Sequence, residues 1–110
     1  MLDNLPLLEA VIDHSASGDN VIIAGIADRA IRVYRIMFTV AADTTLTFKN
    51  GATALTGGLT MLKAGAVVLD AYDAGTPQPW FTMDVAADFI INLSPGVSID
   101  GRVYYTQASP

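Results

Sequence analysis

The segment 46-LTFKNGATALTGG-58 is decisive for the fold, because it has the pattern of two short strands joined at Asn50-Gly51. Before the turn, polar residues at positions 45, 47 and 49 alternate with Leu46 and Phe48, as in a strand with one buried face. Asn-Gly tolerates positive φ at both central residues of a type I′ turn better than almost any other pair. We therefore expect a two-residue hairpin loop that sets the register between residues 44–49 and 52–56.

Two-residue alternation, interrupted by turn-forming residues, continues along the chain and predicts an all-β sandwich. The other runs of this kind are NVIIAGI (20–26), IRVYRIMFTV (31–40), AVVL (66–69), DFIINLS (88–94) and VSIDGRVYYTQ (97–107). In the last run the alternation continues through Gly101, so Asp100-Gly101 is predicted to lie within a strand, with a bulge or a close approach at the glycine. Within residues 31–40 the apolar positions change from odd to even near Arg35-Ile36, which indicates a β-bulge or a strand that bends between two sheets.

Two segments also fit helical spacing. In the first, Ile26, Ala30, Val33 and Met37 recur at helical intervals, and in the second, residues 83–90 are long enough for two helical turns. We expect strands in both, because β-branched residues dominate the first segment and the second is short.

The composition indicates one domain with a surplus of apolar surface. The chain has 110 residues, of which 52% are hydrophobic and 15% charged, whereas ordinary globular chains have roughly 45–50% and about 25%. No stretch approaches the roughly 20 apolar residues of a membrane span, and the N-terminus lacks the basic lead of a secretory signal. We expect a soluble protein, with an N-terminal arm or first edge strand at residues 1–17, a sandwich domain at residues 18–110, and an oligomer interface that covers the surplus.

The charge balance argues against nucleic acid as a partner. Six basic and eleven acidic residues give a net charge of −5, and the basic residues are scattered along the chain. Such a surface repels a phosphate backbone on average. The chain has no cysteine, which excludes disulfides, thiolate nucleophiles and zinc held by cysteine.

Residues that carry chemistry do not form a recognisable motif, so we expect no enzymatic activity and no cofactor. His14 is the only histidine and has no identified partner, so a structural or surface role is expected. Asp70, Asp73, Asp84 and Asp88 supply oxygen atoms of the kind that bind calcium, but their spacing matches no metal loop, and solvated turn aspartates are the simpler interpretation.

Three sets of residues are candidates for contacts with other molecules. Trp80 and Phe81 form an aromatic pair in a Pro-rich connection and either stack on a sugar or a partner, or close one end of the sandwich. Tyr104 alternates with Asp100, Arg102 and Thr106 on the polar face of the last strand and is a candidate for a contact between subunits. The apolar residues of the arm either dock on a neighbouring molecule, with Pro6 opposing a helix, or cover the edge of their own sandwich. These arm residues are Leu2, Leu5, Leu7 and Leu8.

Several segments in order along the chain resemble a group of small tailed-bacteriophage structural proteins. They are GDNVIIAGIADRAIRVYRIMF, LTFKNGATALTGG, PWF, INLS and VSIDGRVYYTQ, and together they extend over residues 18–107. The group has an apolar strand, a basic-apolar strand, a hairpin with F-x-x-G-x-x-x-L-T-G, a tryptophan loop, L-N-L-S and V-x-G-x-x-x-Y. This chain has INLS in place of L-N-L-S, and DAYDAGTPQ lengthens the connection before Trp80.

The resemblance implies a jelly-roll-like antiparallel β-sandwich that is used on virions and has no catalytic residues. A chain this short suits a capsid decoration (cement) protein, made in the host cytoplasm and bound to the major capsid protein on the outer surface of the shell. Virion modules of this kind are commonly trimers. The alternative is a tail-fibre or adhesin module that binds a host-surface carbohydrate through Trp80, Phe81 and the adjacent aspartates.

Overall fold

The computed structural model describes residues 7–70 and 78–109, and the regular structure in these residues is entirely β. The ten strands are β1 (Leu8–His14), β2 (Gly18–Ile23), β3 (Ala30–Val40), β4 (Thr44–Asn50), β5 (Thr53–Ala54), β6 (Leu59–Met61), β7 (Ala66–Asp70), β8 (Phe81–Thr82), β9 (Phe89–Ser94) and β10 (Ile99–Ala108). The all-β prediction is confirmed, and strands, not helices, occupy the two ambiguous segments wherever their structure is regular.

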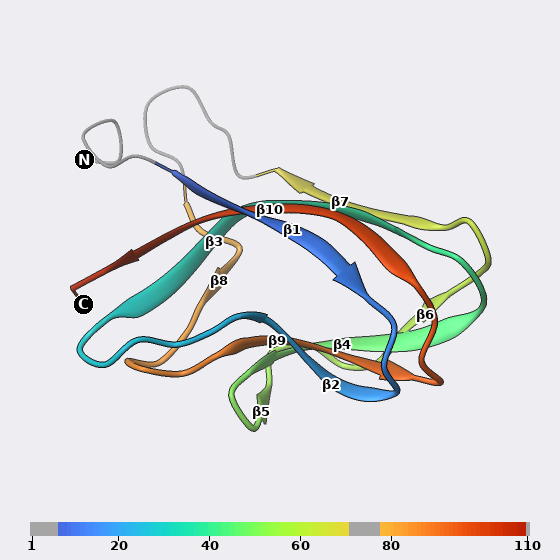
Figure 1. The fold of residues 1–110 in the computed structure, drawn as a ribbon, viewed down its shortest axis with the longest axis horizontal. Helices are drawn as coiled ribbons and strands as arrows, with labels where there is room; N and C mark the ends of the chain where they lie inside the picture. Colours follow the sequence, from blue (N-terminus) through green and yellow to red (C-terminus); the bar gives the residue numbers. More distant parts are fainter. Residues whose placement is uncertain (1–6, 71–77, 110) are drawn as a thin grey trace.

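The strands form two antiparallel sheets that face each other as a sandwich (Figure 1). Sheet A has the order β1-β10-β3-β7, with β8 also paired to β3, and sheet B has the order β2-β9-β4-β5, with β6 also paired to β4. Strands from the two ends of the chain therefore lie side by side, β1 next to β10 and β2 next to β9. The antiparallel sandwich is confirmed, and the more specific jelly-roll assignment stays a prediction.

Alternating side chains from both sheets fill the space between them. Four phenylalanines connect the two layers: Phe38 and Phe81 come from sheet A, and Phe48 and Phe89 come from sheet B. The ring centroid of Phe48 lies 4.9 Å from that of Phe81, 6.0 Å from that of Phe89 and 6.2 Å from that of Phe38. Ring pairs at these separations add attraction beyond the burial of their apolar area.

The predicted change of phase in residues 31–40 is a β-bulge in β3. Tyr104 of β10 pairs with Arg35, but the next residue, Tyr105, pairs with Val33, so Tyr34 has no partner in the ladder. The extra residue shifts the buried apolar positions of β3 from odd numbers (31, 33) to even numbers (36, 38, 40).

Gly101 lies inside β10, as the sequence predicts, at a close approach between β10 and β3. A Cβ atom at this position would lie 1.9 Å from the carbonyl oxygen of Met37 and 2.5 Å from the Cα of Phe38. One detail of the strand differs from the prediction: Thr106, expected on the polar face, is buried. It lies opposite Arg32, on the far side of the bulge at Tyr34.

The hairpin after β4 differs from the prediction by one residue. Asn50 pairs with Thr53, so the loop residues are Gly51 and Ala52. Gly51 has a φ of +57°, whereas Asn50 is not among the residues with positive φ. Positive φ at the first loop residue alone is typical of a type II′ turn, so the type I′ assignment is wrong. Asn50 stays in the ladder because it pairs with Phe89 of β9, and its Oδ1 accepts a 3.0 Å hydrogen bond from the Asp84 N–H.

Most of the described N-terminal region belongs to the sandwich. Residues 8–14 form the edge strand β1, which pairs with β10 from Leu8↔Tyr105 to His14↔Ile99. Ile12 is completely buried, whereas Leu7 and Leu8 are each 43% exposed. Leu2 and Leu5 lie outside the described residues, and docking by the arm stays a prediction.

We expect Gly51→Val to destabilise the protein by about 1–2 kcal/mol, because left-handed backbone is unfavourable for a β-branched residue. The space itself is open, since the nearest atom to a Cβ at this position would be the Cβ of Ala87 at 3.7 Å. The measurement is the urea midpoint of unfolding. Gly51→Asn is the matched control and should lose less, because asparagine tolerates positive φ. Equal losses in the two variants would contradict this explanation.

Candidate functional site

The outer face of sheet A carries three rows of side chains that cross four strands. The ladders place Val11, Arg102, Met37 and Val68 side by side in the central row. Glu9, Tyr104, Arg35 and Asp70 form the row on one side of it, and Asp13, Asp100, Thr39 and Ala66 form the row on the other side. We call this set of twelve residues the A face.

The central row of the A face exposes apolar side chains to solvent. Val11 and Val68 are each 66% exposed, and Met37 is 53% exposed. They occupy outward positions of strands whose inward positions are already apolar, so the hydrophobic interior of the sandwich does not need them. A depression lined by Met37, Val68, Arg102 and Tyr104 lies over the middle of the face. An open surface of this kind is typical of a contact with another protein, whereas small molecules usually bind in enclosed pockets.

Two ion pairs lie beside the exposed apolar side chains, one between the central row and the neighbouring row and one within that neighbouring row. Arg102 Nη1 donates to Glu9 Oε1 at 3.0 Å, and Arg35 Nε donates to Asp70 Oδ1 at 3.0 Å. The guanidinium carbon of Arg35 also lies 5.8 Å from the centre of the Tyr104 ring, within the range of a cation–π interaction. Because exposed ion pairs add little to stability, their main effect here is to neutralise two carboxylates beside the apolar row.

Both arginines of this face stay fully charged. The hydrogen bond to Asp70, followed by the charge of Asp70, raises the pKa of Arg35. The hydrogen bond to Tyr104, followed by the charge of Glu9, raises the pKa of Arg102. These two positive charges of the A face therefore persist through neutral pH.

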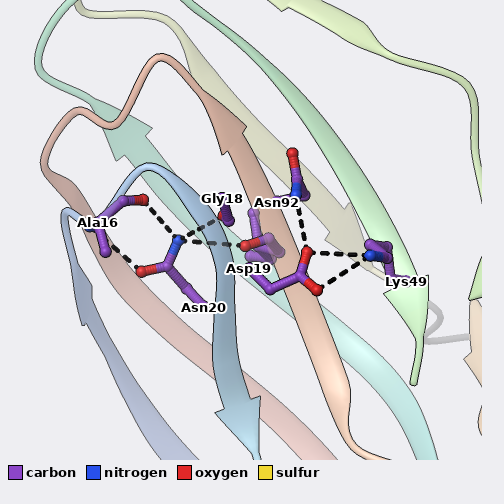
Figure 2. A network of polar contacts seen from close by, with 7 residues as sticks. Ala16, Gly18, Asp19, Asn20, Lys49 and Asn92 are labelled. Atoms are coloured by element: carbon purple, nitrogen blue, oxygen red, sulfur yellow. Dashed lines mark hydrogen bonds and ion pairs between the residues drawn. The ribbon is translucent and has the colours of Figure 1, made fainter. Parts of the chain in front are cut away.

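The outer face of sheet B carries a polar network instead (Figure 2). Asp19 of β2 accepts a 2.7 Å hydrogen bond from Asn92 Nδ2 of β9 and two 3.0 Å bonds from Lys49 Nζ of β4. The hydrogen bond from Asn92, followed by that from Lys49, lowers the pKa of Asp19. The network ties three neighbouring strands together, because Asp19, Asn92 and Lys49 come from β2, β9 and β4.

Asn20 fixes the turn between β1 and β2 beside this network. Its side chain is 5% exposed, and its Nδ2 donates to the carbonyl oxygens of Ala16, Gly18 and Ile91 at 2.9, 3.2 and 3.3 Å. Its Oδ1 accepts a 3.3 Å hydrogen bond from the Ala16 N–H (Figure 2). These bonds satisfy a buried amide, so the role of Asn20 is structural.

The aromatic pair predicted as a contact site is divided by the fold. Phe81 packs against Phe48 and Phe89 and closes part of the core. Trp80 is 48% exposed, and its backbone N–H donates to the Val33 carbonyl at 2.8 Å. Trp80 alone is therefore available for stacking on a ligand.

The predicted aspartate candidates do not come together in the described part of the chain. Asp70 pairs with Arg35, Asp88 Oδ1 accepts a 2.7 Å hydrogen bond from the Gly25 N–H, and Asp73 lies outside the described residues. Within residues 7–70 and 78–109, no group of three or more His, Asp or Glu side chains is arranged to hold a metal ion. His14 is at the end of β1, next to the A face but not part of it.

Sequence reasoning placed Tyr104 correctly on the outer face of β10 but missed the apolar row beside it. The signal was present in Val11, Met37 and Val68, which are apolar residues at outward positions of their strands. It becomes visible only when the strand order is known, because these residues are far apart in the sequence.

The comparisons with known proteins assign no family: no family model, curated protein or solved structure matches this chain. None of the described segments forms a helix long and apolar enough to cross a membrane.

We expect Asp19→Asn to lower stability near neutral pH and to have a smaller effect in acid. The lowered pKa means that the charged carboxylate is favoured in the folded state; this contribution is present above the ordinary value of 3.8 and is lost as the pH falls through the folded pKa. The measurement is the urea midpoint of wild type and variant between pH 7 and pH 3. Asp100→Asn, at an exposed position of the A face, is the control. A difference between wild type and Asp19→Asn that is the same at every pH would refute the role of this carboxylate.

Proposed function

We propose that this protein is a non-catalytic structural protein of a bacteriophage virion, a capsid decoration protein that binds the outside of the shell as an oligomer. The observation that carries the proposal is the A face, where three exposed apolar side chains lie beside two ion pairs on the outside of a sheet. The sequence segments that resemble phage structural proteins give the proposed setting. The partner is the major capsid protein of the shell, and the trimer implied by the resemblance stays a prediction.

The A face has the composition that a protein interface requires. Three of the four side chains in its central row are apolar, and the charge of the fourth, Arg102, is balanced by Glu9, whereas Asp13 and Asp100 lie in an outer row. Apolar side chains and arginine are both typical of the centre of protein interfaces. Arg35 and Tyr104 are residue types enriched at such sites. Many copies on one shell raise the effective concentration of neighbouring contacts, so each contact needs only modest affinity.

We expect Met37→Glu to weaken binding to undecorated shells at least about tenfold, because it replaces an apolar side chain in the middle of the contact with a charged one that loses its water on binding. Co-sedimentation of the purified protein with shells measures the effect. Val21→Glu is the matched control, since Val21 is an exposed apolar residue of β2 in the other sheet. Circular dichroism confirms that both variants fold. Full binding by Met37→Glu, or equal losses in the two variants, would remove the A face as the shell contact.

A second candidate is the tail-fibre or adhesin module that binds a host-surface carbohydrate. The half-exposed Trp80 favours it, because an exposed indole is a stacking surface for a sugar ring. Phe81 takes no part in this candidate function, since its ring belongs to the core.

If the protein binds carbohydrate, a glycan array should show a defined set of ligands, and Trp80→Ala should abolish the signal without loss of the β spectrum in circular dichroism. Met37→Glu should then bind the same glycans as wild type, because Met37 lies in the A face. An array without any signal for wild type would eliminate this candidate.

A further inference from the structure

The strand β7 forms an edge of sheet A. It pairs with β3 from Thr39↔Ala66 to Arg35↔Asp70, and no described strand pairs with its other side. The other strand at this edge, β8, pairs with β3 further along, at Arg32 and Val33. An open strand edge is a template for pairing with another chain unless the sequence prevents it.

Among the described edge strands, β7 has the fewest features that prevent pairing. Its first four residues, AVVL, are apolar, and β7 contains no lysine, proline or register shift. The opposite edge of sheet A, β1, carries the exposed charges of Glu9 and Asp13. In sheet B, β2 has a register shift between Val21 and Ile23, and β5 and β6 are only two and three residues long.

The backbone direction of β7 follows from the bonds at its start. Val40 N–H donates to the Gly65 carbonyl at 3.0 Å, and Ala64 N–H donates to the Val40 carbonyl at 2.9 Å. In an antiparallel ladder, successive residues direct their backbone groups alternately toward and away from the partner strand. Counting from Gly65, the backbone groups of Ala66 and Val68 are directed to the open edge.

We propose that β7 pairs in antiparallel orientation with β7 of a second copy of this chain, across a two-fold axis at Val68. In this register Val68 faces its own copy, Val67 faces Leu69, and Ala66 faces Asp70. The outward backbone groups of Val68 then form the central hydrogen-bonded pair, in which each copy donates one bond and accepts one. The strand is thus complementary to itself, as a two-fold interface requires.

The distribution of charge also favours two-fold pairing through β7 over pairing through β1. The chain has a net charge of −5, so two copies repel each other on average, but Asp70, the one charged residue of β7, is paired with Arg35 at 3.0 Å. The equivalent two-fold pairing of β1 would place Glu9 opposite Asp13, and like charges directly opposite are destabilising. Pairing through β7 avoids this repulsion.

The pairing also covers exposed apolar surface. Val68, which is 66% exposed, would lie between Met37 of its own chain and Val68 of the second copy. A five-residue strand pair is small compared with the roughly 1,200–2,000 Å² of a standard stable interface, so the dimer should be weak, with dissociation at micromolar concentration or above. The inference does not depend on the proposed shell contact, since it concerns the edge of the sheet and the free protein.

The test is sedimentation equilibrium of the full chain from micromolar to sub-millimolar concentration. Wild type should show a monomer–dimer equilibrium. Val68→Pro should raise the dissociation constant at least about tenfold, because proline removes the central outward N–H at a position where an edge strand tolerates it. Val68→Lys and Val68→Glu should each dimerise more weakly than wild type, and an equimolar mixture of these two should recover dimer, because position 68 faces itself.

Val11→Lys is the matched control, since Val11 has the same exposure in the same row but lies on β1. It should leave dimerisation unchanged. If Val68→Pro does not fold, as judged by circular dichroism, the mixture of the lysine and glutamate variants decides. A wild-type protein that stays monomeric, a trimer without dimer, a mixture that recovers nothing, or an equal loss in Val11→Lys would each overturn the inference.

Discussion

The pairing of β10 with β3 is the contact on which the rest of the sandwich depends. It joins ten residue pairs, from Ile99↔Val40 to Ala108↔Ala30, and β10 also pairs with β1 on its other side. Gly101 makes this central position possible, since any Cβ there would collide with the backbone of Met37 and Phe38. Because residues near the C-terminus must find β3 before sheet A is complete, this fold relies on long-range contacts, which are typical of slowly folding β-proteins.

The second sheet is held to the first by aromatic packing and by bonds from side chains in the connections. Phe48 contacts the rings of Phe38 and Phe81 from sheet A. Asp88 accepts a hydrogen bond from the Gly25 N–H, which joins the connection before β9 to the connection after β2. Asn20 of β2 binds the carbonyl oxygens of Ala16 in the preceding turn and of Ile91 in β9. The consequence is a rigid scaffold whose outer faces are free to differ: a polar network on sheet B and an apolar row on sheet A.

The distribution of apolar residues explains how so short a chain can be 52% hydrophobic. Only every second side chain of a strand points into the interior. The remaining apolar side chains therefore lie at outward positions, such as Val11, Met37 and Val68. Exposed apolar surface of this kind is characteristic of contacts with other protein molecules. The proposed shell contact would cover the face, and the proposed two-fold pairing would cover its β7 edge.

The sequence alone determined the fold class, the change of phase within β3 and the position of Gly101 within a strand, because alternation and its interruptions are local properties of the chain. That this change of phase is a bulge, and not a bend between two sheets, was decided by the pairing of β3 with β10. It did not determine the hairpin loop, since Asn50 is kept in β4 by pairing with Phe89 and by its bond to Asp84, both distant in sequence. Trp80 and Phe81 had the same local pattern, and only packing against Phe48 distinguished the half-buried ring of Phe81 from the more exposed ring of Trp80. The A face and the β7 edge were likewise decided by tertiary structure, because strand order brings together residues from four separate segments, and periodicity within one segment contains no information about its neighbours.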